Sequence, residues 1–133
     1  AALEGVAARA AATRIDEATL AHLERLIADM REAASRNDQA AHASADFAFH
    51  QTIVKASGNR MAEQVWQTMR LATTTFVTHS MTQLTHRSLL EIGERHVPVL
   101  EALRARAPAL AEAAMRKHIE EPGEWIRNAI ERS

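Results

Sequence analysis

Four side chains that commonly bind divalent metals are spread over three segments of this sequence. Asp46 and His50 lie four residues apart in ADFAFHQTIV, and His96 and His118 follow on two later amphipathic segments. Residues four apart in a helix share a face, so this carboxylate and imidazole would point to the same side. Three imidazoles and one carboxylate suit zinc first, and also nickel, iron or manganese. On an octahedral ion, four protein ligands would leave two positions for a small chelating anion.

Each of these residues also has an ordinary structural explanation. A single histidine on the apolar side of a helix is more often a hydrogen-bonded core residue than a ligand, and Asp46 could be a solvated helix residue. However, Asp46 stands among the apolar residues Ala45, Phe47, Phe49 and Ile53, and a buried carboxylate needs a cation beside it. Spacing alone leaves the metal site and the ordinary core as open alternatives. The other histidines, His22, His42, His79 and His86, are predicted to lie at the surface.

Two kinds of metal enzyme would use similar ligands. Two histidines and a carboxylate form the facial triad of non-haem iron oxygenases, and a metal-bound water beside a carboxylate base would form a hydrolase. The sequence offers no clear second catalytic group for either reaction, since it has no HExxH motif, no cysteine and no glycine-rich phosphate loop. We therefore expect a binding domain and not an enzyme. The alternative is a metal-dependent all-helical enzyme acting on a small carboxylate.

The composition predicts an all-α fold that brings these segments together. The sequence is rich in alanine and has only 4 glycines and 3 prolines, which favours helices. We expect an antiparallel bundle of about six or seven helices. The helices that can be delimited cover residues 3–12, 16–35, 39–55, 60–80 and 87–104, and a last one begins at 108. Pro98 should kink the fifth helix or restart it near Val97, and Pro122 should bend the last helix just past His118.

The spacing of apolar residues predicts which face of each helix is buried. Two stripes at spacings of three and four are expected in the core: Leu20, Leu23, Ile27, Met30, and Leu89, Ile92, His96, Val99, Leu103. Further buried positions are expected in the fourth and last helices: Met61, Val65, Met69, Ala72, Phe76, and Leu110, Ala114, His118, Trp125. Asn37 and Asp38 are expected to end the second helix and cap the third, and Gly58 to end the third in a left-handed conformation.

Length, charge and cysteine content restrict the class of protein. The 133 residues fit one domain. The 16 basic and 17 acidic residues leave a formal net charge of −1, so no basic surface for nucleic acid is expected. The lack of cysteine excludes disulfides and is typical of cytoplasmic proteins. No apolar run approaches the roughly 20 residues that span a bilayer, so no membrane association is expected. The start at AALEGVAARAA, without methionine, is expected to continue from a longer protein.

Three segments, DFAFHQTIVKASGNRM, ERHVPVLEAL and ALAEAAMRKHI, occur in this order. Together they resemble the C-terminal ligand-binding domain of GntR-family transcription regulators of the FadR-like branch, the FCD domain. The resemblance runs from about Leu3 to the C-terminus. It implies one FCD-type effector-binding and oligomerisation domain over residues 1–133, folded as an all-helical bundle around a central metal site. It also implies that Asp46, His50, His96 and His118 match the metal ligands of the family.

The resemblance further implies a function. In such regulators a small organic acid, such as a hydroxy acid, a sugar acid or a citrate-like molecule, binds at the metal. Binding alters how a pair of winged helix-turn-helix domains binds DNA. A homodimer is expected because two such domains must contact two half-sites. DNA would be contacted only through an N-terminal domain that is absent from this chain. Because some members of the branch bind acyl-CoA without a metal, a metal-free pocket is a third hypothesis.

A carboxylate effector needs polar partners beside the metal. Arg70 is the candidate guanidinium, because arginine binds carboxylates through a paired fork, and Thr73, Thr74 and Thr78 could add hydroxyls. Asn59 matches the asparagine that follows the third helix in the family, and capping suits it better than ligand binding. The sequence departs from the family where Ala107 replaces a polar cap and where Pro122-Gly123 interrupts the last helix. The second departure could reshape the pocket floor beside His118.

Overall fold

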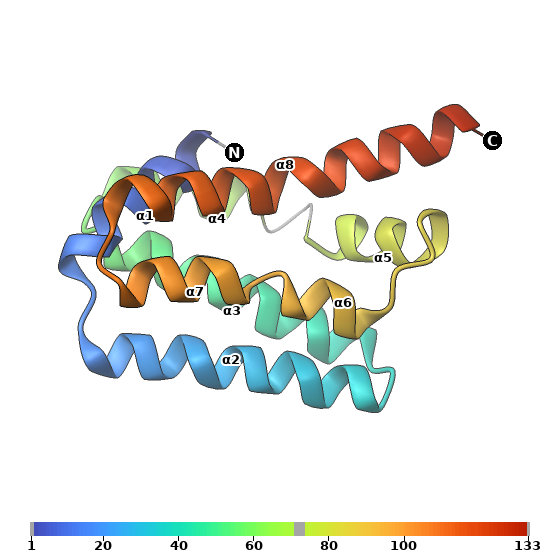
Figure 1. Ribbon diagram of the computed structural model, residues 1–133, viewed down its shortest axis with the longest axis horizontal. Helices are drawn as coiled ribbons and strands as arrows, with labels where there is room; N and C mark the ends of the chain where they lie inside the picture. The colour runs from blue at the N-terminus through green and yellow to red at the C-terminus, as the bar shows by residue number, and fades with distance from the viewer. Residues whose placement is uncertain (1, 71–73, 133) are drawn as a thin grey trace.

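The computed structural model describes residues 2–70 and 74–132, except for the side chains of residues 2 and 74–76. In these ranges it contains eight helical segments and no strand, which confirms the predicted all-α fold. The helices are α1 (Ala2–Arg14), α2 (Glu17–Ser35), α3 (Gln39–Ala56), α4 (Arg60–Arg70), α5 (Thr74–Leu84), α6 (Leu89–Glu94), α7 (Val97–Arg104) and α8 (Pro108–Arg132). The helices pack as a bundle, and the C-terminal end of α8 extends beyond it (Figure 1).

Two predicted helices correspond to two segments each. Helix α6 ends at Glu94 and α7 begins at Val97, as expected from Pro98, which has no N–H to donate to the carbonyl of Glu94. The helix predicted over residues 60–80 corresponds to α4 and α5, and residues 71–73 lie outside the described ranges. Pro122 does not end α8, which continues to Arg132.

The two main apolar stripes predicted from the sequence are buried in the core. The side chains predicted for α2 and for α6–α7 are all buried: Leu20, Leu23, Ile27, Met30, Leu89, Ile92, His96, Val99 and Leu103. The four α2 side chains, together with Val99 and Leu103 of α7, pack with Phe49 and Ile53 of α3 and with Ala111 and Met115 of α8. This core holds together the three segments that carry the predicted metal ligands.

The predicted core face of α4 is wrong. Met61, Val65 and Met69 are 75, 46 and 58% exposed, whereas Trp66 is 1% exposed. Trp66 packs against Phe47 of α3, with ring centroids 5.0 Å apart. Aromatic side chains bury a large apolar area and pack favourably against one another, so the Trp66 face of α4 is the one turned toward α3. The positions predicted at residues 72 and 76 lie outside the described side chains.

The inward position predicted for Leu110 in α8 is also wrong, since this side chain is 57% exposed. The neighbouring Ala111 and Met115 fill the core instead, and both are fully buried. The rotation of α8 that places Met115 inward also turns His118 inward, three residues further on.

Asp16 and Asp38 accept backbone N–H bonds at the starts of α2 and α3, as Asp38 was predicted to do. The end of α3 has the left-handed glycine predicted from the sequence, since Gly58 has φ +77°. A Cβ at this position would also collide with the guanidinium of Arg14.

We expect Gly58→Ala to lower the free energy of unfolding by about 1–2 kcal/mol, because a left-handed residue with a Cβ is strained. Gly123→Ala is the matched control, since a Cβ there meets nothing within 4 Å. In the interior of α8 this change should stabilise by about 0.5–1 kcal/mol. Urea unfolding of the two variants would contradict this view if Gly58→Ala were neutral or if both shifts had the same sign.

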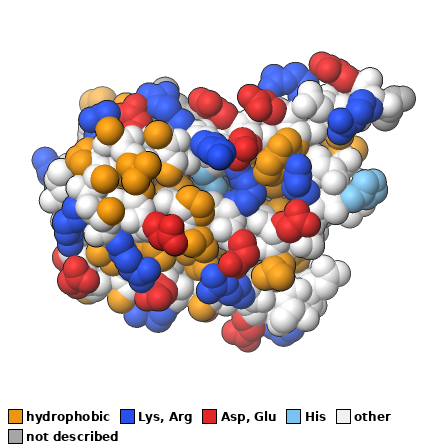
Figure 2. Space-filling view, viewed as in Figure 1, with side chains coloured by type: hydrophobic (Ala, Val, Ile, Leu, Met, Phe, Trp, Pro, Cys, Tyr) orange, Lys and Arg blue, Asp and Glu red, His pale blue; other side chains and the backbone are white. Residues whose placement is uncertain are grey.

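No helix in the described part of the chain is long and apolar enough to cross a membrane. On the face shown in Figure 2, basic and acidic side chains are interspersed, with apolar side chains between them. This mixed distribution agrees with the near-neutral net charge, and among the described residues on the face shown there is no continuous basic area of the kind that binds nucleic acid.

Candidate metal centre

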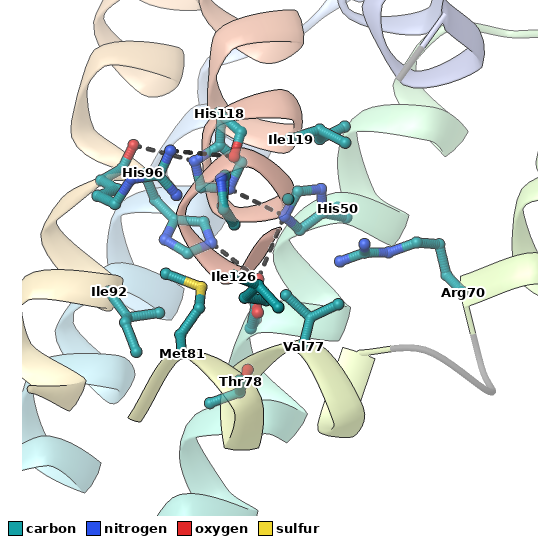
Figure 3. A pocket seen from close by; sticks show the side chains of 14 residues that line it. His50, Arg70, Val77, Thr78, Met81, Ile92, His96, His118, Ile119 and Ile126 are labelled. Carbon is teal, nitrogen blue, oxygen red and sulfur yellow. Dashed lines mark hydrogen bonds and ion pairs between the residues drawn. The ribbon is translucent and has the colours of Figure 1, made fainter. Parts of the chain in front are cut away.

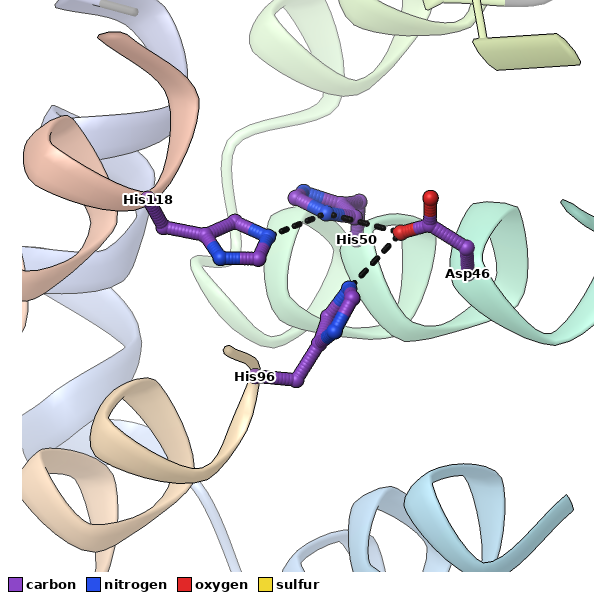
Figure 4. A group of neighbouring side chains, drawn as sticks. All are labelled: Asp46, His50, His96 and His118. Carbon is purple, nitrogen blue, oxygen red and sulfur yellow. Dashed lines mark hydrogen bonds and ion pairs between the residues drawn. The ribbon is translucent and has the colours of Figure 1, made fainter. Parts of the chain in front are cut away.

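The four predicted metal ligands meet in the middle of the bundle (Figure 4). One ligand atom from each of Asp46, His50, His96 and His118 can be chosen so that all four lie within 4.8 Å of one another. Asp46 Oδ1 is 2.8 Å from His96 Nε2 and 3.2 Å from His50 Nε2. His118 Nε2 is 3.2 Å from His50 Nε2. All four residues are buried, with exposed fractions between 1 and 8%.

The helices explain this convergence. Asp46 and His50 lie one turn apart on the inner face of α3, as their spacing predicted. His96 lies at the α6–α7 junction, where its backbone N–H bonds to the carbonyl of Gly93. His118 projects from α8. The ring of Phe49 contacts His96 edge-on, with centroids 4.8 Å apart, and restricts the orientation of this imidazole.

The second ring nitrogen of each histidine faces a hydrogen-bond acceptor. His50 Nδ1 lies 2.5 Å from Glu4 Oε1, His96 Nδ1 lies 2.9 Å from the carbonyl of Gly93, and His118 Nδ1 lies 3.2 Å from the carbonyl of Arg95. Each Nδ1 therefore carries a proton, and each Nε2 is directed inward. Acceptors placed in this way orient histidine ligands in many metal sites and increase their basicity.

The buried charges stabilise one another. Burial alone would raise the pKa of Asp46, but His96 and His50 hold it well below its usual range. Burial would lower the pKa of His50, yet Glu4 and Asp46 outweigh this effect and raise it to about 9. Burial lowers the pKa of His118 well below its usual range, and the neighbouring histidines act in the same direction.

This donor set fits a divalent cation. With each Nδ1–H directed at an acceptor, the Nε2 atoms converge with a carboxylate oxygen, and each Nε2 would offer its lone pair to a metal ion that displaces any proton it carries. Electron-rich atoms as close as the Nε2 atoms of His50 and His118, at 3.2 Å, need a proton or a metal ion between them. Three imidazoles and one carboxylate match the preference of zinc, nickel, iron or manganese.

A cavity of about 160 Å³ adjoins the four ligands (Figure 3). Its described lining combines the ligands with two arginines, one hydroxyl and several apolar side chains: Asp46, His50, His96, His118, Arg70, Arg95, Thr78, Val77, Met81, Ile92, Ile119, Pro122, Gly123 and Ile126. Figure 3 shows Arg70 extending from α4 toward His50. The cavity can therefore bring a small anion near both the ligand set and a guanidinium.

Only some of the residues predicted to bind the effector line the cavity. Arg70 and Thr78 line the cavity. Thr73 and the side chain of Thr74 lie outside the described residues. Asn59 is absent from the described lining, and its Oδ1 accepts the N–H of Ala62 at 3.0 Å. Asn59 thus caps α4, which is the structural role preferred for it from the sequence.

The sequence did not predict the burial of two polar residues beside the candidate ligands. Glu4, only 5% exposed, was not selected, although Glu4, Ala8, Ala11 and Ile15 follow a helical spacing of three and four. His42 was predicted to be solvated, but it is fully buried one turn before Asp46. Its four-residue spacing from Asp46 could have indicated the inner face of α3.

The ring of His42 packs closely against Gly93. A Cβ on Gly93 would lie 3.3 Å from His42 Nε2. Neither ring nitrogen of His42 makes a hydrogen bond with the described residues. Burial lowers the pKa of His42, although the negative charge of Asp46 opposes that shift. His42 is therefore a neutral packing residue at this position.

The chain can now be compared with known proteins. The FCD domain model matches residues 1–121. "Probable D-xylose utilization operon transcriptional repressor" of Paenarthrobacter nicotinovorans is 30% identical over 121 residues, which cover 89% of this chain and 50% of that protein. "Glc operon transcriptional activator" of Escherichia coli K12 is 32% identical over 122 residues, which cover 88% of this chain and 48% of that protein. The chain thus spans about half the length of these relatives.

A solved structure of E. coli McbR/YncC has the same fold. It matches with a TM-score of 0.80 at 16% identity, over 95% of this chain and 63% of that one. The named relatives are transcription regulators, in agreement with the prediction that this domain is not an enzyme. The family match covers most of the sequence, and the chain belongs to the FCD domain family of GntR-type transcription regulators.

Proposed function

We propose that this domain is a metal-dependent sensor of a small carboxylate. The observation that carries the proposal is the convergence of Asp46, His50, His96 and His118 beside a cavity that also contains Arg70. The four side chains would hold the ion, with zinc as the first choice and nickel, iron or manganese as alternatives. The ion would supply a positive centre to which a carboxylate oxygen can bind.

The residues of the chain supply the selectivity. Arg70 can pair with a carboxylate through two parallel N–H bonds, and Thr78 adds a hydroxyl on the α5 side of the cavity. Apolar side chains from α5, α6 and α8 surround the rest of the cavity and exclude water from the carbon skeleton. A cavity of about 160 Å³ favours acids of a few carbon atoms.

The regulatory role is proposed from the family and from the two relatives. In a complete regulator, the sensor would act as a homodimer in the cytoplasm, and DNA would be bound by a separate N-terminal winged helix-turn-helix domain. The acid would change DNA binding only as far as it binds one state of the dimer more tightly than the other.

Elemental analysis of the purified domain tests the proposal directly. We expect about one metal ion per chain, removed by dialysis against a chelator, and a lower melting temperature for the stripped sample, because a ligand that binds only the folded state stabilises it. Adding zinc back should restore the melting temperature. Small carboxylates screened on the zinc-loaded domain should raise it further. A domain that contains no metal and does not respond to zinc, nickel or manganese would disprove the proposal.

A further inference from the structure

Glu4 lies at the centre of a buried contact between three helices. It is on α1, and its Oε1 lies 2.5 Å from His50 Nδ1 on α3. Its Oε2 lies 3.8 Å from the Nε of Arg70, on α4. The side chains of Glu4 and His50 are only 6 and 2% exposed, and that of Arg70 is 17% exposed. One carboxylate therefore contacts both a candidate metal ligand and the arginine of the cavity.

The contact to His50 differs from those of the other two ligands. His96 and His118 direct their Nδ1 atoms at backbone carbonyls of the α6–α7 region, Gly93 and Arg95. His50 alone of the three directs its Nδ1 at a side chain, one that belongs to a helix bearing none of the four ligands. A carboxylate increases the electron density on the imidazole more than a neutral carbonyl does, and it fixes the ring orientation. This bond is a direct link between a candidate metal ligand and α1.

We propose that Glu4 is a positioning residue of the metal centre, and that its bond to His50 makes the stability of α1 depend on metal occupancy. This inference rests on the proposed function, since it requires that the site hold a metal. It adds a fifth residue to the four ligands and identifies α1 as the element that responds to occupancy. The contact of Glu4 with Arg70 places the same carboxylate beside the proposed effector pocket.

Three variants test the assignment. Glu4→Gln keeps an oxygen acceptor without the charge, and Glu4→Ala removes both. Loss of such an outer partner costs about 10–100-fold in metal affinity, so we expect zinc to bind about tenfold more weakly to Glu4→Gln and up to about a hundredfold more weakly to Glu4→Ala. Glu112→Gln is the matched control, because Glu112 joins α8 to Arg9 of α1 at 2.5 Å and contacts none of the four ligands in the described part of the chain.

Two further readouts separate positioning from general stability. The visible absorption of the Co²⁺-loaded domain reports the environment of the ligands, and it should shift in Glu4→Gln but not in Glu112→Gln. Hydrogen exchange of the α1 amides should slow on addition of zinc to the wild-type chain, and this protection should be lost in Glu4→Ala. Thermal melts of the metal-free proteins check that all variants are folded.

The possible outcomes are distinct. A wild-type chain that binds no metal would overturn the proposed function and this inference together. Zinc affinity within twofold of wild type in both Glu4 variants would overturn the inference alone and leave the four-ligand site intact. Unchanged exchange of α1 on zinc binding to the wild-type chain would overturn the link to α1.

Discussion

Replacing His96 with alanine is expected to abolish stoichiometric metal binding. His96 Nε2 is 2.8 Å from Asp46 Oδ1, and its removal leaves three protein ligands and an empty position beside the carboxylate. Because the loss of an outer-shell partner alone costs about 10–100-fold in metal affinity, the loss of a ligand should cost more than about a hundredfold. Elemental analysis after dialysis against a weak chelator should then find far less than one ion per chain.

Two other histidines provide matched controls for this variant. His22 is exposed, so His22→Ala should leave the metal content and the free energy of unfolding unchanged. His42 is fully buried one turn before Asp46 and contributes no ligand atom to the cluster. His42→Ala should therefore keep the metal but lose about 1–3 kcal/mol of stability, within the usual range for point mutants.

The comparison distinguishes a metal site from a pocket merely lined by histidines. In the metal-free hypothesis, the wild-type chain and His96→Ala would both contain almost no metal. If His96→Ala retained a full equivalent while the melting temperature still responded to chelator, the metal would be held elsewhere. If His42→Ala lost metal as completely as His96→Ala, the ligand set would have to include His42.

The inward positions of Asp46, His50 and His96 were predictable because their signals are local. Asp46 and His50 share a helix face by their spacing, and the stripe from Leu89 to Leu103 directed His96 inward. The contacts that support the ligands depend on tertiary packing. Glu4 is 46 residues from His50 in sequence, and no local pattern determines which helix α1 will meet. The sequence offered only an acidic residue in line with buried alanines.

The α4 helix shows a second limit of sequence patterns. It has two apolar faces, one with Met61, Val65 and Met69 and the other with Trp66. Periodicity identifies both faces but not the one that a neighbouring helix covers. The choice depends on the position of Phe47 on α3, against which Trp66 packs. Similarly, the sequence left open whether Pro98 would kink the helix or restart it near Val97, and α7 begins at Val97. Pro122 lies within α8, which continues to Arg132.

Replacing Arg70 with glutamine is expected to weaken carboxylate binding about 10–100-fold, since a hydrogen bond between charged groups contributes about 1.5–3 kcal/mol. Arg70 lines the cavity beside His50. Arg70→Lys keeps the positive charge but cannot form the two parallel N–H bonds of a guanidinium. This variant should therefore bind the carboxylate with intermediate affinity. The probe is whichever acid raises the melting temperature of the zinc-loaded wild-type domain most, and calorimetric titration of that acid gives the affinities.

Metal content must be measured on the same samples, because Arg70 also contacts Glu4. Zinc affinity should fall much less in Arg70→Gln than in Glu4→Ala, since Arg70 does not touch a ligand nitrogen in any described contact. Arg25→Gln, an exposed change on α2, should leave both affinities unaltered. If Arg70→Gln bound the acid within twofold of wild type while holding its zinc, the guanidinium would have no part in recognition. Arg95 would then be the residue to replace, because it is the other guanidinium of the described lining.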